Sequence, residues 1–164
     1  MVVVDSSALI PLAWVGRLDL ITDRFDEVRT TEGVRGEVLV EGKPGTAALD
    51  SFLDEVTVRE TPSNAERVAQ LEGIAVTDAA VVLLAAETDD PLLANDGALV
   101  DVGRAHGVDC WWVTTLLLAA ADDGTLTAEA ATDLLYDLVD EGMNLHPRVY
   151  TQIQSKLREL GDSD

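Results

Sequence analysis

The sequence is poor in three features that would identify other classes of protein. It has one cysteine in 164 residues, which excludes a disulfide framework and a cysteine-rich zinc site. Aromatic residues make up only 4% of the chain, so its core must be built from small aliphatic side chains. The longest uncharged run, residues 110–121, is far shorter than the roughly 20 apolar residues of a membrane span. The first residues are also too short and too acidic for a signal peptide, so we expect a cytoplasmic protein without membrane contact.

Positive charge is scarce as well. Eleven basic residues stand against 31 acidic ones, the net charge is −20, and Lys43 and Lys156 are the only lysines. Such a surface repels phosphate groups, which argues against a nucleic-acid partner at ordinary salt. The same composition also suits a cytoplasm at molar salt, where the Debye length falls to about 3 Å. We favour this halophile-type interpretation, so the net charge alone does not exclude an RNA substrate.

Short apolar runs alternate with helical patterns along most of the chain. The predicted strands are residues 2–4, 28–30, 56–58, 91–94 and 108–113, and the helices among them are residues 8–13, 33–40, 44–53, 78–86 and 97–106. Further helices are predicted at residues 127–139 and 147–160, and the expected N-caps are Ser6 or Ser7, Thr31, Thr77 and Thr127. This alternation predicts an α/β fold with a mostly parallel sheet. We expect one domain over residues 1–164, with 121–164 as its helical cap.

Four carboxylates lie beside the predicted core segments. Asp5 and Asp96 follow two of the strands, where an open parallel sheet binds its ligands. Asp78 begins an apolar helix, and Glu37 lies inside another. Charges in such places are tolerable if they face one another across Mg²⁺ or Mn²⁺, which prefer oxygen ligands. Taken singly, all but Asp5 also suit a helix cap or a solvated helix face.

Four segments resemble, in the family's order, the acidic motifs of the PIN domain, the metal-dependent ribonuclease fold used by VapC-type toxins. They are residues 2–10 (VVVDSSALI), 36–39 (GEVL), 77–79 (TDA) and 92–96 (LLAND). Residues 124–142 are similar to the C-terminal helical region of an archaeal PIN subgroup, so the resemblance covers nearly the whole chain. It implies a three-layer α/β/α sandwich with a central, mostly parallel sheet and C-terminal helices.

The resemblance also implies which residues form the site. The implied catalytic residues and metal ligands, with Mg²⁺ or Mn²⁺ as the cofactor, are Asp5, Glu37, Asp78 and Asp96. The candidates for supporting positions around them are Ser6, Ser7, Asp101 and Thr115. Each of these four supporting residues also has a plain structural interpretation, as a helix cap or as a solvated helix residue.

The implied function is an endoribonuclease that hydrolyses RNA phosphodiesters with metal-activated water, as the toxin of a toxin–antitoxin pair does. Its expected partners are RNA, a small antitoxin protein and a second copy of the chain. The alternative is a PIN-like fold without nuclease activity that acts as an RNA- or protein-binding module. The sequence departs from the family after Asp96, where many members have a basic residue: here the nearest one on that helix is Arg104.

Other chemistries fit the sequence less well. A phosphoacceptor signalling domain needs an acidic pair after its first strand and a lysine after its last, and the sequence has neither. The two histidines have no partners at the spacing of zinc ligands. Trp14, Trp111 and Trp112 have faces on which nucleic-acid bases can stack. For the last two, one core position and one edge or interface position is the plainer interpretation.

Overall fold

One sheet of five short strands organises the computed structural model, which describes residues 1–162. Its strands are β1 (Val2–Val4), β2 (Val28–Thr31), β3 (Thr57–Arg59), β4 (Leu92–Leu93) and β5 (Cys110–Trp111). They lie in the order β3-β2-β1-β4-β5, and every described pairing is parallel. In register, Val3 lies beside Arg29 on one side and Leu92 on the other. The predicted parallel sheet is confirmed.

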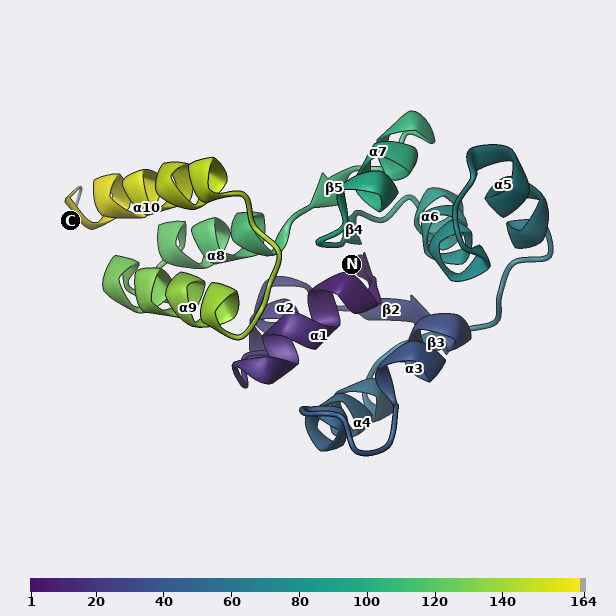
Figure 1. Ribbon diagram of the computed structural model, residues 1–164, viewed down its shortest axis with the longest axis horizontal. Coiled ribbons are helices and arrows are strands. Elements are labelled where there is room, and N and C mark those ends of the chain that lie inside the picture. The colour runs from purple at the N-terminus through teal and green to yellow at the C-terminus, as the bar shows by residue number, and fades with distance from the viewer. Residues whose placement is uncertain (163–164) are drawn as a thin grey trace.

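Helices cover both faces of this sheet (Figure 1). Those in the first half of the chain are α1 (Ser6–Trp14), α2 (Asp19–Arg24), α3 (Glu32–Val38), α4 (Thr46–Asp54) and α5 (Ala65–Glu72). Those in the second half are α6 (Val76–Thr88), α7 (Gly97–Ala105), α8 (Val113–Asp122), α9 (Ala128–Asp140) and α10 (Pro147–Asp162). Helices α5 and α7 both pack on α6, while α1 packs with α3, α4 and α9, and α2 packs with α8. The fold is a three-layer α/β/α sandwich.

Burial explains why the strands are continuous apolar runs. The three valines of β1, at the centre of the sheet, are fully buried. A strand covered by helices on both faces has no polar side, so its residues do not alternate between apolar and polar. The C-terminal helices contribute to the same core, since Leu135 and Leu157 belong to the hydrophobic cluster that contains the strands.

The strand order creates a switch point between β1 and β4. From β1 the chain proceeds to β2 and β3 on one side, and it returns to β4 and β5 on the other. The connections on the two sides cover opposite faces, so a crevice forms beyond the carboxyl ends of β1 and β4. Asp5 follows β1 and Asn95 closely follows β4, which places both at this crevice.

Two helix starts differ from the prediction. Asp5 itself is the N-cap of α1, because its carboxylate accepts the backbone N–H of Ser7, so the capping role predicted for Ser6 or Ser7 is wrong. Helix α6 begins at Val76 with Ala75 as its N-cap, so the cap predicted at Thr77 is wrong too. The Thr77 side chain instead packs closely on α3. The caps predicted at Thr31 and Thr127 are confirmed, since each hydroxyl accepts a backbone N–H of its helix.

The remaining differences concern short elements. Helices α2 and α5 were not predicted, and α5 buries only Ala65 and Ala69, which are too small to mark an apolar face. Pro44 does not open α4: the helix starts at Thr46, after Gly45 turns the chain with a left-handed φ of 83°. The last strand ends at Trp111, because α8 begins two residues later.

Within the described residues, no single helix is both long and apolar enough to cross a membrane. Helices α5 and α6 reach that length and composition only when they are taken together, and they are bent by 112° relative to each other.

Candidate active site

Asp5 is the most buried of the predicted site residues. Its side chain is 2% exposed, and its Oδ2 accepts the Ser7 hydroxyl at 2.6 Å and the Ser7 backbone N–H at 3.1 Å. Its Oδ1 is buried and has no hydrogen-bond partner. Burial raises the pKa of Asp5 above its usual value, although the bonds from Ser7 counteract that rise. A buried carboxylate oxygen without a partner is costly, so Asp5 is poised to receive a ligand.

Ser7 connects the ends of the two strands at the switch point. Its hydroxyl donates to Asp5 and accepts the backbone N–H of Asn95 at 2.8 Å. Since Asp5 follows β1 and Asn95 follows β4, this one hydroxyl fixes the two sides of the crevice together. Of the two serines predicted as candidates for supporting positions, Ser7 is the one that contacts Asp5, and it does so from the first turn of α1.

Glu37 lies on α3 and is exposed, unlike Asp5. Its Oε2 accepts the hydroxyl of Ser6 at 2.8 Å, a contact that joins α3 to the start of α1. The two adjacent serines therefore support different carboxylates. Glu37 is also close enough to Asp5 for its negative charge to raise the pKa of Asp5.

Asp78 lies in the first turn of α6 and is half-buried. Its pKa is raised to about 6, first by loss of solvation and then by repulsion from Asp5, Asp96 and Glu37. This electrostatic coupling to all three partners means that the four predicted carboxylates share one region. Within residues 1–162, none of the four pairs with a basic side chain, so their charge is left uncompensated.

Asp96 is exposed and is the N-cap of α7. Its Oδ1 accepts the backbone N–H of Leu99 at 3.2 Å, so the capping role that the sequence left open is observed. Asp101, one turn into α7, is exposed and does not contribute to the charge around Asp78. The Thr115 hydroxyl accepts the backbone N–H of Trp112 and so helps to cap α8. The supporting roles of Asp101 and Thr115 at the site stay predictions.

The four carboxylates occupy one region, but they do not form a finished ligand set. In the described part of the chain, no three His, Cys, Asp or Glu side chains are close enough together to hold a metal ion as they stand. The chemistry of the donors still fits a hard divalent cation, because all are carboxylate oxygens and one is buried without a partner. A cation held by these oxygens would also offset the repulsion that Asp78 meets from Asp5, Asp96 and Glu37.

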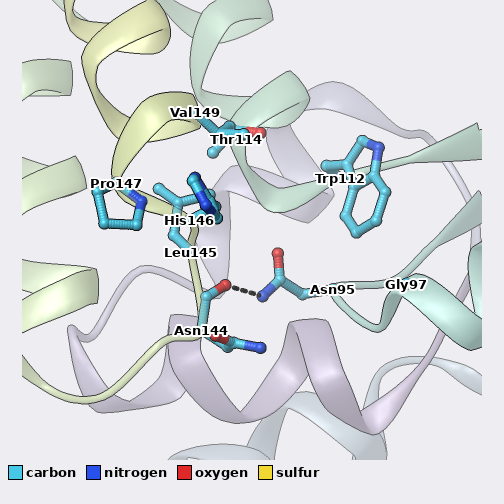
Figure 2. A pocket seen from close by; sticks show the side chains of 9 residues that line it. All are labelled: Asn95, Gly97, Trp112, Thr114, Asn144, Leu145, His146, Pro147 and Val149. Carbon is cyan, nitrogen blue, oxygen red and sulfur yellow. Dashed lines mark hydrogen bonds between the residues drawn. The ribbon is translucent and has the colours of Figure 1, made fainter.

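A cavity of about 650 Å³ opens beside Asn95 and Gly97, the two residues that flank Asp96 (Figure 2). Its walls come from three segments distant in the sequence, which are the start of α7, the start of α8 and the connection from α9 to α10. The lining residues are Asn95, Gly97, Trp112, Thr114, Asn144, Leu145, His146, Pro147 and Val149. The Asn95 amide donates to the backbone carbonyl of Asn144 at 3.2 Å and closes the base of the cavity between the segments.

Sequence reasoning missed most of this cavity. Asn95 belongs to the fourth motif, but only the carboxylate of that motif, Asp96, is a predicted site residue. Its amide side chain and the Trp112 indole carry no pattern that predicts a shared cavity. Residues 144–149 lie about fifty positions further along the chain, and only the packing of α10 on α8 and α9 brings them here. For residues 144–149, the signal in the sequence is the presence of turn-forming residues such as Asn144 and Pro147, which indicate a connection rather than a site.

A parallel sheet with carboxylates beyond its switch point defines an α/β protein with an acidic site. The family model of the PIN domain matches residues 1–159, so the chain belongs to the PIN domain family. Members of this family are in general nucleases, which places the protein among the hydrolases at a coarse level. No curated protein matches the chain.

Two solved structures from archaea are similar to this chain. PAE2754 from Pyrobaculum aerophilum aligns with a TM-score of 0.57 and 26% sequence identity, over 73% of this chain and 96% of the other. A PilT N-terminus domain protein, SSO1118 from Sulfolobus solfataricus P2, aligns with a TM-score of 0.52 and 17% identity, over 73% and 92% of the two chains. The second likeness bears on the fold alone. Together they confirm the three-layer PIN fold.

Proposed function

We propose that this chain is a metal-dependent endoribonuclease that hydrolyses RNA phosphodiesters. The observation that carries the proposal is the Asp5 carboxylate, which is buried with one oxygen unpartnered and is repelled by further carboxylates. In a protein with no ion to bind, replacing such a buried carboxylate by an uncharged residue would increase the stability of the fold. In a member of a nuclease family, the same arrangement is expected of a site that recruits a cation.

The roles follow from the contacts of each residue. The oxygens that would hold Mg²⁺ or Mn²⁺ belong to Asp5, Glu37, Asp78 and Asp96. When bound, such an ion lowers the pKa of a coordinated water and neutralises the charge that develops on the phosphate. Ser7 fixes one oxygen of Asp5 and leaves the other free to act as a ligand. Ser6 holds Glu37 at the edge of the crevice, and Asp96 is anchored by its bond to the start of α7.

The test is cleavage of transfer and ribosomal RNA in molar KCl, with Mn²⁺ or Mg²⁺ compared with EDTA. We expect cleavage that requires the ion and is lost in both Asp5→Asn and Asp96→Asn. The matched control is Asp137→Asn, which removes one exposed carboxylate of α9 that is not among the charges shifting the pKa of Asp5 or Asp78. Cleavage that survives both site substitutions would show that these carboxylates are not the catalytic site.

A PIN fold that binds RNA or protein without cutting is the second candidate. Two observations favour it: no three carboxylates stand at ligand distance within residues 1–162, and no basic residue follows Asp96 directly. Calorimetric titration with Mn²⁺ separates the candidates when it is run beside the cleavage assay. Binding that Asp5→Asn abolishes, with no cleavage of any RNA by the wild type, would favour the binding module.

The expected partners rest on the resemblance, and the expected location rests on the composition of the chain. We propose a small antitoxin and a second copy of the chain as protein partners, in a cytoplasm of high salt. Leu116 and Leu117 of α8 are buried in the core, so this helix does not offer them to a partner.

Since α8, α9 and α10 pack on one another and share the main core, we propose that residues 121–164 belong to one domain with the rest. Light scattering in molar KCl tests the dimer.

A further inference from the structure

The cavity beside the carboxylates has a surface unlike the rest of the molecule. None of the nine residues that line it carries a carboxylate, although the chain contains 31 of them. Its lining combines an indole, apolar side chains and two amides, and its volume is typical of a small-ligand site. We propose that this cavity is a nucleobase subsite, which holds one unpaired base of the substrate while the adjoining phosphate lies at the carboxylates. This inference rests on the proposed function.

The position of the cavity ties it to the proposed reaction. Asn95 and Gly97, which line it, are the residues on either side of Asp96. Asn95 is also bonded through its backbone to Ser7, and Ser7 in turn is bonded to Asp5. Asn95 in the wall of the cavity and the carboxylate of Asp5 are therefore parts of one hydrogen-bonded unit. A nucleotide whose phosphate meets the carboxylates has its base within reach of this wall.

The chemistry of the walls suits a base. Trp112 lies on one side of the cavity, opposite the segment that carries His146 and Pro147 (Figure 2). An indole is a stacking surface for any base, and an enclosed base must be unpaired to reach it. His146 Nδ1 accepts the backbone N–H of Arg148, so in the neutral ring Nε2 carries the proton and can donate.

Polar groups at the base of the cavity remain available. No hydrogen bond among the described residues uses the side-chain amide of Asn144 or the Oδ1 of Asn95. An amide can both donate and accept, so these groups can pair with the edge of a base. The lack of carboxylates in the lining reduces, at short range, the repulsion that a polyanion meets over the rest of this surface. The cavity would therefore give the base a half-enclosed stacking surface next to the crevice that would hold the phosphate.

The experiment uses the full chain labelled with 5-fluorotryptophan, whose fluorine spectrum reports its three tryptophans separately. The probes are the nucleoside 5′-monophosphates AMP, GMP, CMP and UMP, titrated in molar KCl with EDTA, and ribose 5-phosphate is the probe without a base. We expect a saturable shift of the Trp112 resonance with nucleotides, and none with ribose 5-phosphate. Trp111 is the internal control, because it packs edge-on against Phe25 with the ring centroids 5.2 Å apart.

Two variants test the cavity itself. At Gly97 an added Cβ would meet no atom of the protein within 4 Å, so Gly97→Ala keeps the fold and places a methyl group in the cavity wall. We expect it to weaken nucleotide binding severalfold, as read from the Trp112 resonance. Trp112→Ala, followed by equilibrium dialysis, should weaken binding about 5- to 150-fold, which is the range for loss of one base–aromatic stack. Circular dichroism checks that both variants are folded.

The outcomes separate this inference from the proposed function. A Trp112 shift with nucleotides, in a wild-type protein that cuts no RNA with Mn²⁺ or Mg²⁺, would support the subsite and overturn the nuclease. Metal-dependent cleavage with a silent Trp112 resonance at millimolar nucleotide, and with unchanged KM in Trp112→Ala, would overturn the subsite and leave the nuclease. An equal response to ribose 5-phosphate would show a phosphate site and would also overturn the inference.

Discussion

At the scale of single residues, the neighbouring serines Ser6 and Ser7 provide a matched pair. Ser7→Ala removes the 2.6 Å bond to the buried Asp5 and leaves the backbone N–H of Asn95 without its acceptor. We expect a loss of about 1 to 3 kcal/mol in the free energy of unfolding, because buried polar groups lose their partners. Ser6→Ala removes a bond to the exposed Glu37, so we expect a change within about 0.5 kcal/mol.

Urea denaturation in molar KCl without divalent ions measures both serine variants. If the two substitutions cost the same, the hydroxyl of Ser7 does not hold the crevice together. Calorimetry with Mn²⁺ adds a second readout, in which Ser7→Ala should bind the ion more weakly than the wild type. The reason is that removal of this hydroxyl frees Asp5 to rotate and raises its pKa further, since the bonds from Ser7 lower it.

The raised pKa of Asp78 makes the stability of the protein depend on pH. The unfolded chain releases this proton near the usual value of 3.8, whereas the folded protein holds it until about pH 6. Below pH 3.8 both states are protonated and the carboxyl imposes no penalty. As the pH rises from 3.8 to about 6, the folded state becomes less stable relative to the unfolded state, and above that the penalty is constant.

Asp78→Asn should therefore stabilise the protein at pH 7.5 and leave it nearly unchanged at pH 4. We expect about 1 to 2 kcal/mol at pH 7.5, after allowing for solvent screening of a half-buried group. Urea denaturation at several pH values, without divalent ions, measures the difference. Asp137→Asn is the control for removing one negative charge, and a gain as large in that variant would attribute the effect to net charge alone.

At the scale of elements, an ion pair joins β2 to the end of α6. Arg29 Nη1 donates to the buried Asp90, Nη2 contacts the exposed Glu27 at 3.2 Å, and Nε is buried without a partner. Asp90→Asn would leave the guanidinium with a single exposed partner. We expect a loss of about 2 to 3 kcal/mol, near the lower end of the range for a broken buried pair.

A double-mutant cycle with Arg29→Met completes this test. The double variant should be more stable than Asp90→Asn alone, because it leaves no unpaired buried charge. Urea denaturation in 0.1 M and 2 M KCl gives both values and their salt dependence. A cost for Asp90→Asn that vanishes in 2 M KCl would show that the pair is screened like a surface contact.

The elements that the sequence predicted well are those with a strong local signal. Strand β1 is three valines, and the start of α9 is marked by Thr127, whose hydroxyl caps the helix. Helix α5 had no such signal, because it packs through alanines against alanines of α6. The end of the last strand was misplaced because the apolar run continues from Trp111 into α8, and helix and strand share that composition.

The location of the candidate site was predictable for a topological reason. In a parallel sheet, residues after the strands meet at one edge, so Asp5 and Asp96 had to lie near each other. The contacts within the site were not predictable, since the Ser6–Glu37 bond depends on how α3 packs on α1. The nucleobase subsite depends on residues from the start of α10, which no local pattern connects with the fourth motif.

At the scale of the whole molecule, the acidic crevice lies within an acidic surface. The described ion pairs engage only a few of the 31 carboxylates, so most of the charge is balanced by solvent ions. The resulting field concentrates cations near the crevice and repels a polyanion. RNA binding in such a protein must depend on short-range contacts, which is the role that the carboxylate-free cavity beside Asp96 would supply.

The same charge predicts how the stability of the protein responds to salt. Raising KCl from 0.1 to 1 M shortens the Debye length from about 10 Å to about 3 Å, which screens the self-repulsion of 20 net negative charges. We expect the midpoint of thermal unfolding at pH 7.5 to rise steeply over this range and to rise much less from 1 to 3 M, where screening is nearly complete. Near pH 4.1, the isoelectric point, the net charge is close to zero, so the rise should largely disappear. An equal rise at both pH values would mean that salt stabilises this protein through hydration of its surface rather than through screening.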